Sequence, residues 1–189
     1  NSLEGKFLIA SPSITDPRFS KCLIYMIYDN ENGSMGLIVN KPAKNININN
    51  MFQNFQEIDS NIIYSPTVYY GGPVDLDKGF ILHSNDYKTN EEKKLLNNGL
   101  MLSSNVNILK DIAIGKGPSK SILAVGYAGW QQKQLYDELK QNTWFEADLD
   151  IDLLFLCNVN SKWEKALSKV GINKQKIINS NFSSFSGSA

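Results

Sequence analysis

The sequence has little histidine, cysteine or arginine, and each shortage excludes a class of function. Its 189 residues include one histidine, His83, which is too few for a zinc site built on several histidines. Its two cysteines, Cys22 and Cys157, lie far apart and form neither a metal-ligand spacing nor a disulfide framework. Both lie in apolar runs, so we expect buried free thiols in a reducing compartment. No cofactor is predicted.

Arginine is as scarce as histidine, because Arg18 is the only one in the chain. The 19 Lys and Arg residues balance 19 Asp and Glu residues, so the net charge is zero. Proteins that read DNA bases usually carry a basic excess and use arginine for bidentate contacts to guanine. Direct nucleic-acid binding is therefore not expected.

The neutral total conceals two charged stretches. Residues 137–152 hold six acids against Lys140, and residues 160–189 hold five lysines against Glu164. These are either two solvated faces or two segments that pair with each other, within one chain or between copies.

Long apolar runs are also missing. The longest, Cys22–Tyr28, has seven residues, whereas a membrane-spanning helix needs about 20. The first residues show no basic region followed by an apolar core, so we expect no signal peptide, no membrane association and a cytoplasmic protein.

Local patterns predict an α+β fold, with residues 1–189 forming a single domain. Residues 20–29 and 34–40 are β-rich runs around a turn cluster, which predicts an antiparallel hairpin with a loop of four or five residues. Further strands are predicted over 6–11, 67–70, 79–84, 99–103, 121–126, 143–147 and 151–157. Helices are predicted over 46–55, 106–114, 131–141 and 161–170. The last of these has a capping box formed by Ser161 and Glu164, and Gly171 supplies its stop.

Two glycine-rich segments, 69–74 and 126–130, place glycine beside large aromatic residues at strand ends. Together they predict a ligand pocket with a glycine backbone floor and walls from Tyr127 and Trp130. The competing interpretation is a pair of tight turns that pack a small core. The candidate ligand-binding residues are Asn40, Pro42, Gly71, Gly72, Pro73, His83, Gly129, Trp130 and Gln134.

Two other groups have possible chemical roles. His83 ends a predicted strand, where it is either a structural histidine or a general base. In an extended chain Asp148, Asp150 and Asp152 would share one face, which makes them a candidate site for a hard metal ion. The alternative is a solvated acidic face, and no other metal site is predicted.

The chain resembles the YqgE/AlgH family of bacterial proteins. The resemblance rests on residues 5–12, 16–19, 33–42, 71–74, 79–83 and 126–130, with Gln134-Leu135, Trp163 and Ala166-Leu167. It implies an α+β fold in which a small closed β-barrel and a bifurcated, largely antiparallel sheet are flanked by helices. Some family members are named as candidate transcriptional regulators from a role in alginate synthesis. One departure is Asp29, which stands where the family usually has histidine.

Two functions follow from these observations. The first is a non-enzymatic regulatory or binding protein that acts through an unidentified small molecule or protein partner. The second is an enzyme whose pocket joins His83, Trp130 and Gln134. The second requires these three side chains to converge.

Overall fold

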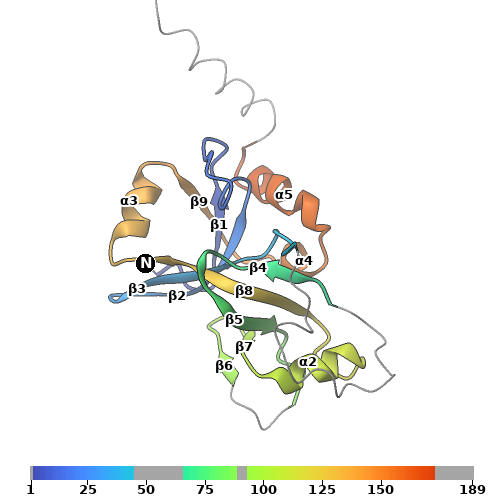
Figure 1. The fold of residues 1–189 in the computed structure, drawn as a ribbon. Coiled ribbons are helices and arrows are strands. Elements are labelled where there is room, and N and C mark those ends of the chain that lie inside the picture. The colour runs from blue at the N-terminus through green and yellow to red at the C-terminus, as the bar shows by residue number, and fades with distance from the viewer. Residues whose placement is uncertain (1, 45–65, 89–92, 173–189) are drawn as a thin grey trace, which may run out of the picture.

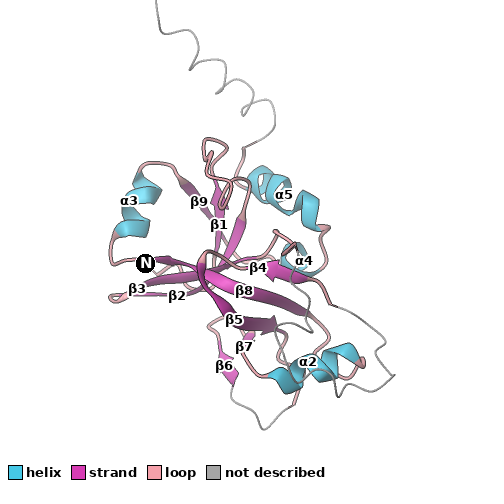
Figure 2. Ribbon diagram, in the orientation of Figure 1, coloured by secondary structure: helices cyan, strands magenta, loops and turns pink. Residues whose placement is uncertain are grey.

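The computed structural model describes residues 2–44, 66–88 and 93–172 of the chain (Figures 1 and 2). The strands are β1 (Phe7–Ala10), β2 (Leu23–Asn30), β3 (Gly33–Ile38), β4 (Val68–Tyr70), β5 (Val74–His83), β6 (Lys93–Leu95), β7 (Met101–Ser103), β8 (Ser121–Trp130) and β9 (Trp144–Ala147). The helices are α2 (Val106–Ala113), α3 (Gln134–Lys140), α4 (Ile151–Phe155), the 3₁₀ turn η2 (Val159–Ser161) and α5 (Lys162–Lys169). The helix predicted over 46–55 lies outside the described residues.

The strands form a mixed sheet that is mostly antiparallel, as predicted. Its order is β6-β7-β5-β8-β3-β2-β1-β9, and β4 pairs in parallel with β8 outside this path. One edge of β8 pairs with β5, while β4 and β3 share the other edge: β4 pairs with Leu123–Val125 and β3 with Ala128–Trp130. The sheet is therefore bifurcated at β8, which runs through the middle of the molecule (Figure 1).

The predicted closed barrel is not confirmed, because the sheet is open. The path ends at β6 and β9, and these strands lie at opposite ends of the molecule (Figure 1). They have three and four residues, so each is a short edge rather than a closing strand. The curled sheet is a half-barrel with helices beside it.

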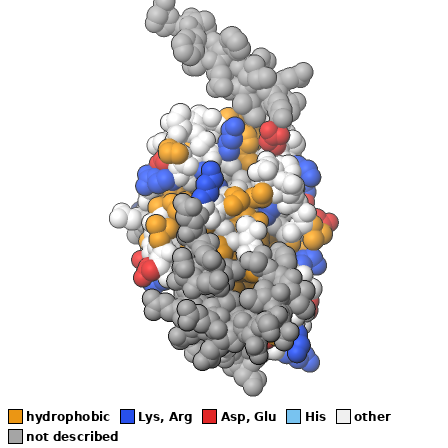
Figure 3. All heavy atoms as spheres, turned by 45° about the vertical axis from the view of Figure 1, so that its right-hand side comes forward, with side chains coloured by type: hydrophobic (Ala, Val, Ile, Leu, Met, Phe, Trp, Pro, Cys, Tyr) orange, Lys and Arg blue, Asp and Glu red, His pale blue; other side chains and the backbone are white. Residues whose placement is uncertain are grey.

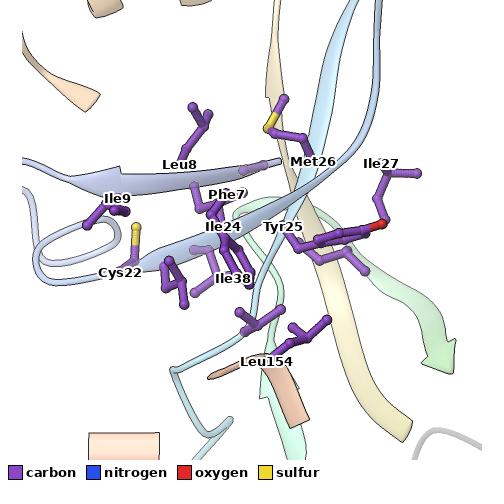
Figure 4. Packing of buried hydrophobic residues seen from close by; sticks show 14 of the residues in the cluster. Phe7, Leu8, Ile9, Cys22, Ile24, Tyr25, Met26, Ile27, Ile38 and Leu154 are labelled. Atoms are coloured by element: carbon purple, nitrogen blue, oxygen red, sulfur yellow. The ribbon is translucent and has the colours of Figure 1, made fainter. Parts of the chain in front are cut away.

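The core lies around β1, β2 and β3, where side chains from these strands pack with Leu154 of α4 (Figure 4). All four residues of β1 are fully buried, and so are Leu23–Met26 of β2. Burial on both faces explains why β2 is a continuous apolar run rather than an alternating one. The predicted hairpin of β2 and β3 is confirmed, but its loop is shorter, because Asn30 already pairs with Gly33.

One strand prediction was wrong. The segment predicted as a strand over 151–157 instead contains helix α4, Ile151–Phe155. The Asp150 side chain caps this helix by accepting a hydrogen bond from the Leu153 backbone N–H at 2.9 Å. Helix α5 was predicted correctly, and Gly171 ends it with φ of 79°. Ser161 does not cap α5 with its side chain, and donates its hydroxyl to the Asn158 carbonyl instead.

In the part of the chain that the structure describes, no helix is long and apolar enough to cross a membrane.

Candidate functional site

The two glycine segments meet at the branch of the sheet. Gly71 donates its N–H to the carbonyl of Val125 in β8 at 2.8 Å, and its own carbonyl accepts the N–H of Ile38 in β3 at 2.8 Å. Gly71 thus bridges β3 and β8 by backbone hydrogen bonds at the point where the two strands diverge. A Cβ on Gly71 would lie 2.3 Å from the Gly126 carbonyl oxygen, which explains why only glycine fits.

The space between these segments is closed rather than concave. A Cβ on Gly72 would lie 2.1 Å from the backbone of Tyr127, and one on Gly126 would lie 2.4 Å from the Gly72 carbonyl oxygen. Both glycines have positive φ, 152° at Gly72 and 67° at Gly126. The backbones therefore contact each other where a ligand was predicted, and Pro73, which is half-buried, follows this contact. The tight-turn interpretation fits this geometry.

Asn40 and Pro42 hold neighbouring backbone in place. Asn40 Oδ1 accepts the Leu23 N–H at 2.8 Å and its Nδ2 donates to the Lys21 carbonyl at 2.9 Å. Pro42 forms an isolated antiparallel bridge with Tyr69 of β4. Both residues order the connection that follows β3.

Trp130 and Gln134 belong to a third group, centred on a carboxylate. Glu138 Oε2 accepts the indole N–H of Trp130 at 2.9 Å and of Trp144 at 2.6 Å. Its Oε1 accepts the side-chain amide of Gln134 at 2.9 Å. The two indole rings meet edge to face with centroids 5.8 Å apart. Trp130 is the last residue of β8, and the Glu138 carboxylate joins α3 to β8 and β9. Gly129, beside it, is exposed.

His83 is fully buried at the other end of β8. Its Nε2 is 3.0 Å from Ser103 Oγ, and its Nδ1 is 2.9 Å from the Ser84 carbonyl oxygen. A carbonyl can only accept, so Nδ1 carries the proton and Nε2 accepts from the serine hydroxyl. Burial lowers the pKa of His83, which keeps the ring neutral.

The structure does not bring His83 and Trp130 together. His83 pairs with Ser121, the first residue of β8, and Trp130 is the last. Nine residues of extended chain correspond to roughly 30 Å. The pocket required by the enzyme hypothesis is therefore not formed by these side chains.

The acidic stretch does not form a shared face. Strand β9 ends at Ala147 and α4 begins at Ile151, so the chain is not extended through the three aspartates. Asp150 caps α4 and forms an ion pair with Lys169 of α5, while Asp148 and Asp152 are exposed. Within the described ranges, no group of three or more acidic, histidine or cysteine side chains is placed to hold a metal ion. The Asp150–Lys169 pair confirms, at one contact, that the acidic and basic stretches meet.

Asp29 is a buried residue that connects three segments by hydrogen bonds. In the sequence it was notable only because the family usually has histidine at this position. It accepts hydrogen bonds from the Leu3 N–H at 2.8 Å, the Ser34 hydroxyl at 2.6 Å and the Tyr136 hydroxyl at 2.5 Å. Burial acts to raise the pKa of Asp29, but these hydrogen bonds outweigh it and the pKa is lowered. An anionic Asp29 therefore joins the N-terminal segment, β3 and α3.

The described surface has a groove that the sequence did not predict, along β5, β7 and β6. It has a volume of about 420 Å³, and among the described residues it is lined by Phe80, Lys93, Lys94, Leu102, Ser103 and Ser104. Leu102 pairs with Leu82 on one side and Lys94 on the other, so these residues share a face of the sheet with Phe80. Lys94 Nζ also lies 5.8 Å from the ring centroid of Tyr28. We call this the β5–β7–β6 groove.

The side chains of His83 and Ser103 point to the opposite face of the same strands, although Ser103 also borders the groove. They alternate with Leu82 and Leu102, and Ile81 on their face packs against Ile108 of α2. The only histidine therefore does not point into the β5–β7–β6 groove.

A second groove, of about 550 Å³, lies between the β9 end of the sheet and α5. Its lining mixes both charges: Lys6, Glu146, Ala147, Asp148, Leu149, Asp150, Lys169 and Val170. Lys6 pairs with Glu146 at 3.4 Å, and Lys169 pairs with Asp150. Since these charges already neutralise one another, the second groove is less suited than the first to bind a charged ligand.

Known proteins share both the sequence and this fold. A UPF0301 protein of Rickettsia canadensis is 41% identical over 178 residues, which cover 92% of each chain. A UPF0301 protein of Methylobacterium nodulans is 38% identical over 177 residues, covering 90% of this chain and 84% of the other. The solution structure of the AlgH protein from Pseudomonas aeruginosa has 32% identity and a TM-score of 0.74, and covers 100% of this chain and 97% of its own.

A crystal structure of a protein from Corynebacterium diphtheriae shows the same fold at 19% identity, with a TM-score of 0.67, and covers 88% of this chain and 86% of its own. The AlgH-like family matches residues 7–175, which is most of the chain. The chain therefore belongs to the AlgH-like family.

Proposed function

We propose that this chain is a non-enzymatic binding protein whose small-molecule ligand occupies the β5–β7–β6 groove. The observation that carries the proposal is the alignment of Phe80, Leu102 and Lys94 on one face of adjacent strands within this groove. An apolar floor with a few polar groups at its side is the usual composition of a small-molecule site.

The lining defines the chemistry of the ligand. Phe80 and Leu102 are partly exposed apolar side chains. The Phe80 ring also packs edge to face against the Tyr127 ring, with centroids 6.1 Å apart. Lys94 holds its ammonium near Tyr28 and supplies the positive charge of the groove. Lys93 pairs with Ser103, so its side chain points to the other face, where its ammonium donates to the Tyr87 carbonyl at 3.3 Å. An aromatic or aliphatic body that bears a negative charge would satisfy both parts of the groove.

The position of His83 supports a binding role over catalysis. Its ring is fully buried, both nitrogens have partners, and it faces away from the groove. A general base must reach the proton that it removes, and from this position His83 cannot do so without unfolding its strand.

On this proposal, any regulatory effect of the protein would depend on its binding the ligand or a protein partner. Zero net charge and a single arginine support the view that the chain does not read DNA bases. A mobility-shift assay with promoter and random DNA should give the same weak, salt-sensitive binding for both.

Anilinonaphthalene sulfonate, an aromatic anion that fluoresces when bound, is a suitable first probe. Phe80→Ala should weaken its binding about tenfold, because it removes most of the apolar floor. Lys94→Met should weaken it about threefold, because it removes an exposed charge and keeps the length of the side chain. Lys140→Met, which removes an exposed lysine from α3, is the matched control and should leave the affinity unchanged. Equal affinity of all four proteins would exclude the groove as the site.

A further inference from the structure

A second cluster of polar side chains lies on the other edge of β8, around Lys41. The Lys41 ammonium donates to the Pro17 carbonyl at 2.6 Å, and the Lys41 carbonyl accepts the N–H of Tyr70 in β4 at 2.8 Å. Residues 16–18, 41 and 70 are therefore neighbours although they are distant in the sequence. On the face of the molecule turned forward in Figure 3, Lys and Arg side chains lie beside apolar ones.

Arg18 is held in a fixed orientation in this cluster. Its Nε donates to both oxygens of Asp16 at 3.1 Å, and its Nη2 donates to Oδ2 at 2.7 Å. Its guanidinium carbon also lies 5.6 Å from the ring centroid of Phe19. The side chain is nevertheless 58% exposed, and no hydrogen bond within the described residues uses Nη1. Asp16 thus orients the guanidinium and leaves its outer edge available.

Lys41 adds a positive charge to this cluster, and among the described residues no carboxylate forms a hydrogen bond with its ammonium. Its side chain is half-buried, and the described residues provide its ammonium with one acceptor, the Pro17 carbonyl. Burial lowers the pKa of Lys41, although the nearby Asp16 carboxylate acts in the opposite direction. A partly desolvated ammonium with a single neutral acceptor would be stabilised by an anion.

Tyr70 adds a hydroxyl to the two cations. Its backbone N–H is bonded to the Lys41 carbonyl at 2.8 Å, which places Tyr70 beside Lys41. Burial raises the pKa of Tyr70, while the charge of Arg18 acts to lower it and that of Asp16 to raise it. Among the described contacts its hydroxyl has no hydrogen-bond partner. Lys21, at the end of the same loop, holds its ammonium 5.8 Å from the Trp163 ring and adds further positive charge.

We propose that Arg18, Lys41 and Tyr70 form a binding site for an oxyanion of the phosphate class, either free or as a phosphomonoester. An oriented guanidinium, an ammonium and a hydroxyl are the donor types that hold phosphate oxygens in proteins. The site is separate from the β5–β7–β6 groove, because β4 and β5 lie on opposite edges of β8. The two proposals therefore fail independently.

Calorimetric titration with inorganic phosphate, and separately with phenyl phosphate, tests this site at constant ionic strength in chloride. Arg18→Gln and Lys41→Gln should each weaken binding at least tenfold, because each removes a charge-assisted hydrogen bond. Tyr70→Phe removes only the hydroxyl, preserves the ring packing and should weaken binding about threefold. Lys78→Gln removes a lysine that pairs with Asp75 on β5, and should bind as the parent does.

Tighter binding of phenyl phosphate than of inorganic phosphate would identify a monoester as the ligand, and the reverse order would identify the free anion. Either order supports the site if the three variants weaken binding and Lys78→Gln does not. Lack of saturable phosphate binding, or equal losses in Lys78→Gln and Lys41→Gln, would overturn the proposal. A folded Tyr70→Phe protein with undiminished affinity would remove Tyr70 from the site.

Discussion

Glu138 provides a quantitative test of how the structure holds α3 in place. Its carboxylate is the shared acceptor for two largely buried indole N–H groups, at 2.9 Å from Trp130 and 2.6 Å from Trp144. Glu138→Ala leaves both donors without this acceptor, and a buried donor without a partner costs about 1–3 kcal/mol. Partial access of water reduces the sum, so we expect a loss of about 3 kcal/mol in the free energy of unfolding.

Glu138→Gln should cost only about 1 kcal/mol, because the amide oxygen still accepts the indole donors without the negative charge. Urea unfolding followed by tryptophan fluorescence measures these differences, since two of the three tryptophans contact this carboxylate. The control is Glu146→Ala, which breaks an exposed ion pair with Lys6 at 3.4 Å and should cost about 0.5 kcal/mol. If Glu138→Ala were no more destabilising than Glu146→Ala, the assigned role of Glu138 would be wrong.

Three further predictions follow from single residues. Gly126→Ala should destabilise the fold by about 3 kcal/mol or prevent folding, because φ is 67° and the new Cβ would lie 2.4 Å from the Gly72 carbonyl oxygen; thermal unfolding measures this. Burial lowers the pKa of Lys162 to about 8, so above that pH the unfolded chain holds more protons and stability rises by up to about 3 kcal/mol. Urea unfolding at several pH values should show this rise in the parent and not in Lys162→Met. Burial raises the pKa of the Cys22 thiol to about 12, so a thiol reagent should modify Cys157 in the native protein and Cys22 only after unfolding.

The parts of the fold that the sequence predicted are those whose signals are local. The apolar run from Cys22 to Tyr28 and the turn after it define β2 and β3 without information from distant residues. The error over residues 151–157 has a local cause too. An apolar run of that length suits either a buried strand or a short helix, and the Asp150 cap decides between them.

The candidate sites show a different limit. The glycine segments did indicate a close backbone approach, and Gly71 and Gly126 do meet, but their spacing could not tell whether a cavity remains. The β5–β7–β6 groove was missed because Lys93–Leu95 becomes a strand only through pairing with β7, and no β pattern marks it in the sequence. Arg18 was conspicuous by its rarity, yet its neighbours Lys41 and Tyr70 are set by tertiary contacts.

The most direct test of the account is to map bound anilinonaphthalene sulfonate by NMR titration of the ¹⁵N-labelled protein. We expect saturable shift changes centred on Phe80, Lys94 and Leu102, which line the β5–β7–β6 groove. Changes centred instead on the Gly72–Tyr127 contact or on Trp130 would contradict the assignment of the ligand to this groove.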